Sequence, residues 1–428
     1  MPKKLVQITH NACQLEQGPD LNKKPLSEST QEAHQMAFKQ SSFAWILLPF
    51  LLAWTTIGWT QTSEVNDQID GLVREPLVLN VNLPDGQTAT LDAFVTRPDR
   101  PGRWPVALIT HGTDGNQIDR AISPNRFSSA AIAFARHGYA SVVVMRQGYG
   151  NSSGVTDYQH QVGTCEHPHH ARAGKIAADD LIAALSAIRL ESWASPDEAI
   201  MMGQSAGGFA VLAAGADNPP GVQAIINFDG GRGAIKSGGV CDKEHLLASI
   251  ASFGRRSHVP ALWLYAVNDE VFPMPLSREM FDTYLSAGGI GEFQEAPAFE
   301  KNGHVFIEWA PEQTWWNTVA DFLNKQQLAS QEIVALPATD LPAPAELSAA
   351  AKDALRAYAQ NQSYEKAFAT NGKGVWGWSK GERTQDDAAA RAMEYCQKNV
   401  IDDGPACIVY ALGNYLMASG AQVDASSH

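Results

Sequence analysis

Along much of the chain, short apolar runs alternate with segments whose apolar residues recur at helical spacing. Two alternating segments, Pro76–Leu83 and Thr88–Val95, flank an Asp85-Gly86 turn and predict a β-hairpin. Apolar runs after the hairpin predict buried strands at Trp104–Thr110, Tyr139–Met145, Val222–Phe228 and Ala261–Ala266. Two shorter strands are predicted at Glu198–Met202, which leads into the segment GQSAGG, and at Glu292–Ala296. The intervening amphipathic segments predict helices at Phe127–His137, Ala177–Leu190, Lys243–Phe253, Leu276–Leu285 and Thr314–Leu323.

This alternation predicts an α/β fold, with a mostly parallel central sheet covered by helices on both faces and an antiparallel hairpin leading into it. Ligand sites in such sheets lie at the carboxyl ends of the strands. We therefore looked for chemically active side chains directly after each predicted strand.

The strongest membrane-type segment, Phe43–Trp59, contains no charged residue. It is short for a spanning helix, which needs about 20 residues, and Pro49 interrupts it. Its length suits the apolar core of a secretory signal peptide. Because such a core follows the start within a few residues, we expect translation to begin at Met36 and cleavage to fall near Gly58–Gln61. An uncleaved N-terminal membrane anchor is the alternative.

Composition narrows the class of protein further. Apolar residues make up 44% of the chain and charged residues 18%, which excludes a disordered protein. A multi-pass membrane protein is excluded because only one apolar run in the sequence is long enough to suggest a membrane segment. The net charge of −14 argues against nucleic acid as a partner, because phosphate contacts need clustered Lys and Arg.

The segment Gly203-Gln204-Ser205-Ala206-Gly207 matches the pattern G-x-S-x-G. It follows a predicted strand and precedes a helix-compatible run, which is the context of a nucleophile elbow. A chance Gly/Ser turn is the alternative, and the strand and helix on either side favour the elbow. The pattern predicts Ser205 as a nucleophile.

A serine nucleophile needs a base, and the base needs a carboxylate that orients it. In this arrangement the chain order is serine, acid, histidine. His304 lies in the expected place, between the last short strand and the last helix. Asp269 ends a predicted strand and is the favoured acid, with Asp229 at the end of the preceding strand as the second choice. The other histidines after Ser205 suit the role less well: His245, His258 and His428.

The oxyanion of the reaction needs backbone N–H donors. One is expected from Ala206, directly after the nucleophile, and one from the loop after the first parallel strand, where Thr113 is the favoured donor. Gly112 would let the backbone approach closely. His111 is expected to brace this loop and not to take part in catalysis.

With these motifs in place, residues from about 74 to 325 resemble the α/β-hydrolase fold, near its dienelactone-hydrolase and prolyl-oligopeptidase-like branches. The segment Arg146–Gly154 also resembles the R-G-x-G-x-S-x-G segment common there. The remaining motifs of the resemblance are His111-Gly112, Gly203–Gly207, Val267-Asn268-Asp269 and Gly303-His304.

The resemblance implies hydrolysis of a small-molecule ester or related acyl bond through an acyl-enzyme, without a cofactor. Dienelactone hydrolases carry a cysteine nucleophile, so Ser205 argues against a lactone-specific role. A serine peptidase is the first alternative, since prolyl-oligopeptidase relatives share the motifs, although no propeller sequence accompanies them. A non-catalytic binding protein on a hydrolase scaffold is the second.

Two clusters invite other interpretations. Four closely spaced histidines, of the kind that zinc sites use, complete no recognisable ligand set, and we expect no metal there. They are His160, His167, His169 and His170. The tryptophans after His304 are expected to pack the last helix on the sheet, and an aromatic wall of the substrate pocket is the alternative. They are Trp309, Trp315 and Trp316.

The C-terminal quarter has a different pattern. Residues 326–351 form an Ala- and Pro-rich linker, and residues 352–428 predict a small α+β module of a strand pair, a helix and a further strand. The module weakly resembles short secreted modules with a Cys pair, which implies no activity and leaves an unknown binding partner open. We thus expect an N-terminal extension with signal peptide over residues 1–60 and a catalytic domain over residues 61–325.

The odd number of cysteines, five, bears on the compartment. Cys13 precedes Met36 and would be absent from an exported chain that starts there. The four remaining cysteines can all pair, which suits an oxidising compartment. We therefore expect a periplasmic or secreted protein of a bacterial envelope. We expect the bridges Cys165–Cys241, between two loops near the active site, and Cys396–Cys407, within the small module.

Overall fold

The computed structural model describes residues 69–113, 122–154, 163–235, 238–336, 339–400 and 404–417. All of them belong to one compact unit, Ser63–His428. The predicted signal segment, with Cys13 and Met36, lies outside the described residues. Within the described ranges no helix is both long and apolar enough to cross a membrane.

A sheet of eight strands forms the centre of the larger part of the molecule, in the order β1-β2-β4-β3-β5-β6-β9-β10. β1 and β2 form an antiparallel hairpin, β2 pairs antiparallel with β4, and all later pairs are parallel. The predicted mostly parallel sheet with a leading hairpin is therefore confirmed. The strands are β1 (Leu72–Asn82), β2 (Thr88–Pro98), β3 (Trp104–Thr110), β4 (Ala140–Val144), β5 (Ala194–Gln204), β6 (Val222–Phe228), β9 (Ala261–Ala266) and β10 (Gly291–Ala296).

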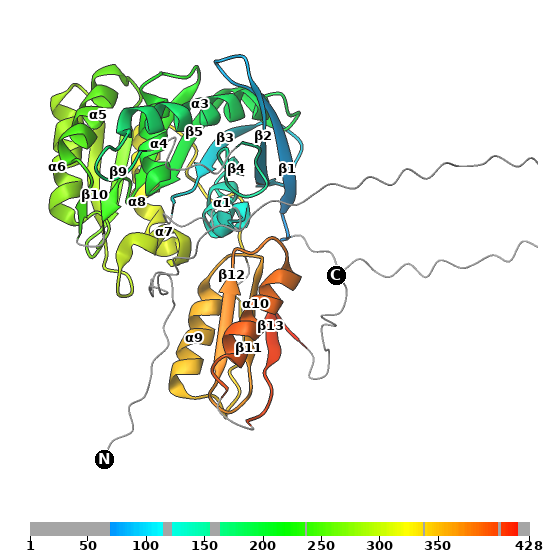
Figure 1. Ribbon diagram of the computed structural model, residues 1–428. Helices are drawn as coiled ribbons and strands as arrows, with labels where there is room; N and C mark the ends of the chain where they lie inside the picture. The colour runs from blue at the N-terminus through cyan, green and yellow to red at the C-terminus, as the bar shows by residue number, and fades with distance from the viewer. Residues whose placement is uncertain are drawn as a thin grey trace, which may run out of the picture. The chain divides into compact units, whose positions relative to one another are not determined.

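Helices cover both faces of this sheet (Figure 1). Each face has its own apolar core, because the continuous Val, Ile, Leu and Ala runs of the strands present side chains alternately to both sides. One face is covered by α3 (His170–Ile188), α4 (Ala206–Gly215), α5 (Lys243–Arg256) and α6 (Met274–Ser286). The other is covered by α1 (Ser128–Arg136), α7 (Phe306–Trp309) and α8 (Trp316–Lys325).

Two of the three tryptophans after His304 pack the last helix on the sheet, as expected. Trp315 and Trp316 are buried in the core under α8, where their rings contact Phe134 of α1. Trp309 is turned to a different neighbour, and its ring meets that of Trp378 edge to face, with the centroids 5.1 Å apart.

The C-terminal part forms a second, smaller unit of structure, an antiparallel sheet with strand order β12-β11-β13-β14 and two helices (Figure 1). Its elements are α9 (Ala349–Gln360), β11 (Lys366–Thr370), β12 (Trp376–Lys380), α10 (Gln385–Gln397), β13 (Ile408–Leu412) and β14 (Tyr415–Leu416). The strand pair, helix and further strand agree with the sequence prediction. Helix α9 is an addition to the predicted elements: Ser348 caps it, and Ala351, Leu355 and Tyr358 are buried along one side of it.

Both expected disulfide bonds are present. Cys165 pairs with Cys241, and Cys396 pairs with Cys407. The first joins the segment before α3 to the residue that follows the short hairpin β7 (Ala234–Ile235) and β8 (Gly239–Val240). The second ties the end of α10 to the residue before β13.

Candidate active site

Ser205 stands at the sharp turn between β5 and α4, as the G-x-S-x-G pattern predicts. Its φ of 56° and ψ of −124° are unusual for a residue with a side chain and mark local strain. Backbone hydrogen bonds hold the turn on both sides, since Ser205 N–H donates to Phe228 O and Ser205 O accepts from Gly231 N–H. The surrounding sheet thus keeps the serine in a conformation that it would not adopt by itself.

The loop after β3 lies directly against this turn. A Cβ atom on Gly207 would come within 2.5 Å of His111 O, and one on Gly112 within 2.8 Å of Ser205 Cβ. Glycine is required at both positions because any side chain would separate the loop from the elbow. Thr113 and Ala206, the two expected oxyanion donors, line the same small pocket.

His111 braces this loop, as expected. Its Nε2 accepts the Arg146 N–H at 3.1 Å, so the proton of the ring is on Nδ1, which donates to Gly112 O at 2.7 Å. Burial, reinforced by the charge of Arg146, lowers the pKa of His111 well below its usual value. A neutral ring with one fixed tautomer orients the Gly112 peptide beside the serine.

The structure brings Asp269 and His304 together. Asp269 Oδ2 lies 3.0 Å from His304 Nδ1, and the Asp269 side chain is fully shielded from solvent. Asp269 Oδ1 accepts the N–H groups of Val271 at 2.7 Å and Phe272 at 3.0 Å. Three donors therefore converge on one carboxylate and fix its orientation toward the histidine ring. His304 belongs to a 3-10 turn, η3 (Gly303–Val305), which lies between β10 and the last helix of the larger part, α8, as the sequence predicts.

Two residues that the sequence analysis did not single out hold the histidine in place. Asn302 caps the turn: its Oδ1 accepts the N–H groups of His304 at 3.0 Å and Glu270 at 3.1 Å. Gln204, next to the serine, donates from Nε2 to His304 O at 2.8 Å. A signal for Asn302 was present, because Asn two residues before a turn residue commonly accepts its N–H.

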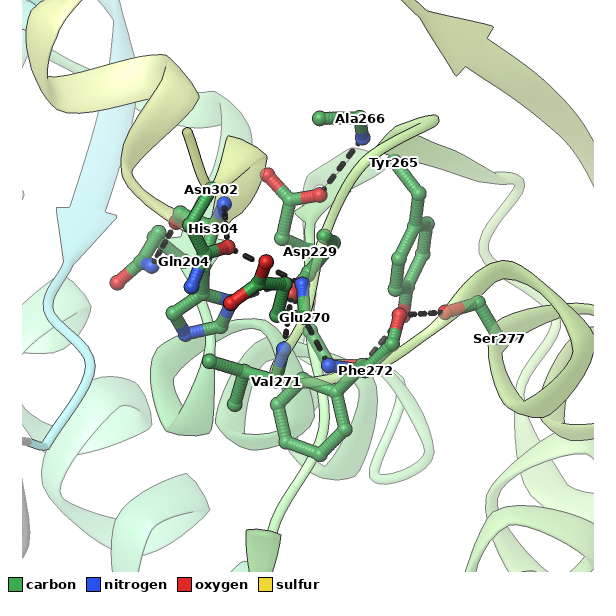
Figure 2. A network of polar contacts seen from close by, with 12 residues as sticks. Gln204, Asp229, Tyr265, Ala266, Glu270, Val271, Phe272, Ser277, Asn302 and His304 are labelled. Atoms are coloured by element: carbon green, nitrogen blue, oxygen red, sulfur yellow. Dashed lines mark hydrogen bonds and ion pairs between the residues drawn. The ribbon is translucent and has the colours of Figure 1, made fainter. Parts of the chain in front are cut away.

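Asp229, the second choice for the acid, is also near this network but has a different partner. Its Oδ1 accepts the Ala266 N–H at 2.8 Å, and the side chain is completely buried (Figure 2). Asp269 and not Asp229 makes the hydrogen bond to the His304 ring. The geometry agrees with the order of preference that the chain order suggested.

The pocket beside Ala206 combines an apolar wall with polar groups. Side chains of α3 and α4 form the apolar wall: Ala173, Ile176, Ala177 and Phe209. Arg146, Gln147, Asp180 and Arg232 supply the polar lining. The first disulfide supports this side of the pocket, because Cys241 O accepts from His170 Nε2, whose Nδ1 is 3.2 Å from Arg232 Nη1.

Asp180 lines the pocket, and its burial should make the stability of the fold depend on pH. Burial raises its pKa to about 6, although its two oxygens accept Gln147 N–H and Nε2–H. Because the folded state keeps the proton longer than the unfolded chain, stability from this group is complete below about pH 4 and is lost as the pH rises through 6. Relative to Asp180→Asn, the wild type should lose roughly 3 kcal/mol of unfolding free energy over this range.

Urea unfolding of both proteins at intervals between pH 4 and 7 measures this loss. The difference between the two free energies should change across the range and stay constant above it. A constant difference throughout would show that Asp180 keeps an ordinary pKa.

The histidine cluster forms no metal site in the part of the chain that the structure describes. No group of three His, Cys, Asp or Glu side chains there is arranged to hold a metal ion. His170 instead makes the buried contacts to Cys241 and Arg232, and His160 lies outside the described residues.

One family model matches part of the chain. Residues 85–272 match the family model of X-Pro dipeptidyl-peptidase (S15 family), a segment that includes Ser205 and Asp269. No curated protein sequence matches the chain.

Solved structures similar to this one include hydrolases of several kinds. A Klebsiella pneumoniae subsp. pneumoniae protein named as a dienelactone hydrolase is 14% identical, with a TM-score of 0.40 over 60% of this chain and 99% of the other. An esterase from an Arctic intertidal metagenomic library is 15% identical, with a TM-score of 0.42 over 60% and 96%. The acylaminoacyl peptidase of Pyrococcus horikoshii is 17% identical, with a TM-score of 0.44 over 61% of this chain and 43% of the peptidase.

The sheet topology, the elbow and the family match all point to the same fold. The sheet is mostly parallel and is preceded by an antiparallel hairpin, the elbow joins its fifth strand to a helix, and the family match spans that elbow. The chain therefore has the α/β-hydrolase fold, with a small antiparallel module at its C-terminal end.

Proposed function

We propose that the protein is an exported serine hydrolase that cleaves a carboxylic ester through an acyl-enzyme. The observation that carries the proposal is the hydrogen bond between Asp269 and His304, made on loops at the carboxyl ends of the strands, beside the strained turn that presents Ser205. A buried carboxylate that orients a histidine is the arrangement that activates a serine hydroxyl.

In the proposed mechanism, Ser205 Oγ attacks the acyl carbon while its proton passes to His304 Nε2. Asp269 holds the Nδ1 proton of the ring and stabilises the imidazolium that forms. The N–H groups of Ala206 and Thr113 stabilise the oxyanion of the tetrahedral intermediate. His304 then gives its proton to the leaving alkoxide. In the second half of the reaction, water attacks the acyl carbon while its proton passes to His304, and His304 returns a proton to Ser205 Oγ as the acid leaves.

An ester with a small acyl group suits the pocket. The wall formed by Ala173, Ile176, Ala177 and Phe209 would accommodate an apolar chain, next to the expected oxyanion donors. A serine peptidase is the second candidate, and the match of residues 85–272 to the X-Pro dipeptidyl-peptidase family favours it.

A substrate series separates the two candidates. Purified protein is assayed on p-nitrophenyl esters with acyl chains of graded length and on an Xaa-Pro p-nitroanilide, each with Ser205→Ala as the blank. We expect turnover of the shorter esters and none of the anilide. Cleavage of the anilide with a higher kcat/KM than any ester would make the protein a peptidase, and a rate equal to the blank on every substrate would leave the binding-protein interpretation.

The proposed location is the periplasm or the cell exterior. Two disulfide bonds support it, because such bonds persist in oxidising compartments. The signal peptide and the start at Met36 remain predictions from the sequence, and N-terminal sequencing of the exported protein checks them. A mature chain that keeps residues 1–35 would contradict them.

A further inference from the structure

Asp229 is a buried carboxyl group beside the catalytic network that the mechanism above does not use. It follows β6 directly, and its side chain has no exposure to solvent. One oxygen, Oδ1, accepts the Ala266 N–H at 2.8 Å. Among the described residues, no N–H or hydroxyl group donates to the other oxygen, Oδ2. Burying a carboxylate oxygen without a hydrogen-bond donor costs free energy. A protonated carboxyl group would avoid this cost, because its hydroxyl oxygen is itself a donor.

The side chain in contact with Asp229 is that of Asp269. The two carboxyl groups interact directly, although they belong to segments that follow different strands, β6 and β9. Burial in the first place, and the negative charge of Asp269 in the second, raise the pKa of Asp229 well above its usual value. Two buried carboxyl groups in contact cannot both be ionised at low cost, so one of them holds a proton.

The hydrogen bonds decide which of the two holds it. Asp269 already accepts three donors, the N–H groups of Val271 and Phe272 and the ring of His304, so both of its oxygens are engaged as acceptors. Asp229 accepts a single backbone donor. The proton therefore belongs on Asp229, where it turns the vacant oxygen into a donor.

We propose that Asp229 is a positioning residue that stays protonated and donates a hydrogen bond to Asp269, which in turn orients His304. The proposal deepens the proposed function and rests on it, since it assigns a role relative to the same triad. With Asp229, four donors surround the Asp269 carboxylate, and its orientation toward the histidine ring is set from β6 as well as from its own loop.

The other titratable groups nearby do not compete for this role. Tyr265, on β9, donates its hydroxyl to Gly230 O and accepts from Asn227 Nδ2 at 3.1 Å. Burial raises the pKa of Tyr265 well above its usual value, so the ring stays neutral. His304 is engaged with Asp269 itself.

Infrared spectroscopy tests the proton directly. We expect the wild type at pH 8 to show the carbonyl band of a protonated carboxylic acid that is absent from Asp229→Asn. Asp180, whose pKa is about 6, is ionised at pH 8 and does not contribute to the band. An identical carboxylic-acid region in the two proteins would overturn the proposal, whether or not the enzyme is active on the chosen ester.

Two variants test the positioning role. The backbone of Asp229 has a φ of 45°, which Asn and Gly adopt readily. Asp229→Asn keeps an N–H donor toward Asp269, whereas Asp229→Gly removes it without backbone strain. We expect kcat within about threefold of wild type for the Asn variant, and a kcat lower by about tenfold with little change in KM for the Gly variant, as one lost hydrogen bond to a charged group predicts.

The pH profile separates positioning from space filling. Without the donor, Asp269 presents more negative charge to His304, so the acid limb of kcat/KM should move to higher pH in the Gly variant and stay in place in the Asn variant. An equal loss of kcat in both variants would mean that a negative charge is required at residue 229. An unchanged kcat in both would mean that the hydrogen bond to Asp269 does not affect catalysis. Either result would contradict the positioning role. A wild type without esterase activity would instead count against the proposed function, and the infrared result would still decide where the proton is.

Discussion

Ser205→Ala should lower kcat on p-nitrophenyl esters by about 10⁴-fold or more and leave the fold unchanged. The physical reason is that the hydroxyl forms the covalent bond of the acyl-enzyme, and no other nucleophile is held at the elbow in its place. The turn itself depends on the hydrogen bonds of the Ser205 backbone to Phe228 and Gly231, which an alanine keeps. Steady-state kinetics with matched circular-dichroism spectra measure the two effects separately.

Ser186→Ala is the matched control. Ser186 lies exposed on α3 and donates its hydroxyl to Ile182 O within the helix, so its loss should change neither activity nor stability measurably. A Ser205 variant as active as this control would exclude the acyl-enzyme mechanism.

The second large effect concerns stability. Glu365→Ala should lower the free energy of unfolding by roughly 3–5 kcal/mol. Glu365 Oε1 and Oε2 accept Arg74 Nη1 at 2.7 Å and Nη2 at 3.1 Å, and the two side chains are only 6% and 3% exposed. This pair joins β1 of the large sheet to the residue before β11 of the small module. Removing the carboxylate leaves the guanidinium charge of Arg74 buried, stacked on the rings of Phe94 and Tyr364.

An exposed ion pair of the same type provides the comparison. Lys243 and Glu279 are about half exposed and join α5 to α6. Glu279→Ala should cost less than about 1 kcal/mol, because solvent screens the pair. Urea unfolding of the two variants beside the wild type gives both values. Equal costs would show that the buried pair does not hold the small module to the larger sheet, and an early separate transition in Glu365→Ala would show that it does.

Much of the larger fold could be predicted because its strands are buried on both faces. Runs such as Trp104–Thr110 and Ala261–Ala266 are continuously apolar, and the observed strands β3 and β9 have those same bounds. The elbow could be predicted for a different reason, since a sharp turn with a serine between small residues has few sequence solutions. The expected chain order of serine, acid and histidine then selected Asp269 and His304 as candidates for the other two residues.

The contacts that could not be predicted from the sequence depend on which elements become neighbours in the folded protein. Asp229 and Asp269 meet because β6 and β9 are adjacent in the sheet, although β7, β8 and α5 separate them in the chain. Nothing near either residue in the sequence reveals that pairing. The contact of Trp309 with Trp378 is similar, because it joins α7 to a strand of the small module. Local patterns describe elements, whereas these contacts arise only once the elements are packed.

Labelling with a fluorophosphonate probe tests the central claim most directly, because the probe reacts only with a serine that a neighbouring base activates. We predict rapid labelling of the folded wild type, with the modification located on the peptide that contains Ser205. Labelling should vanish in Ser205→Ala and slow strongly in His304→Ala. Absence of labelling in folded wild-type protein, or equal labelling in Ser205→Ala, would contradict the assignment of Ser205 as the nucleophile.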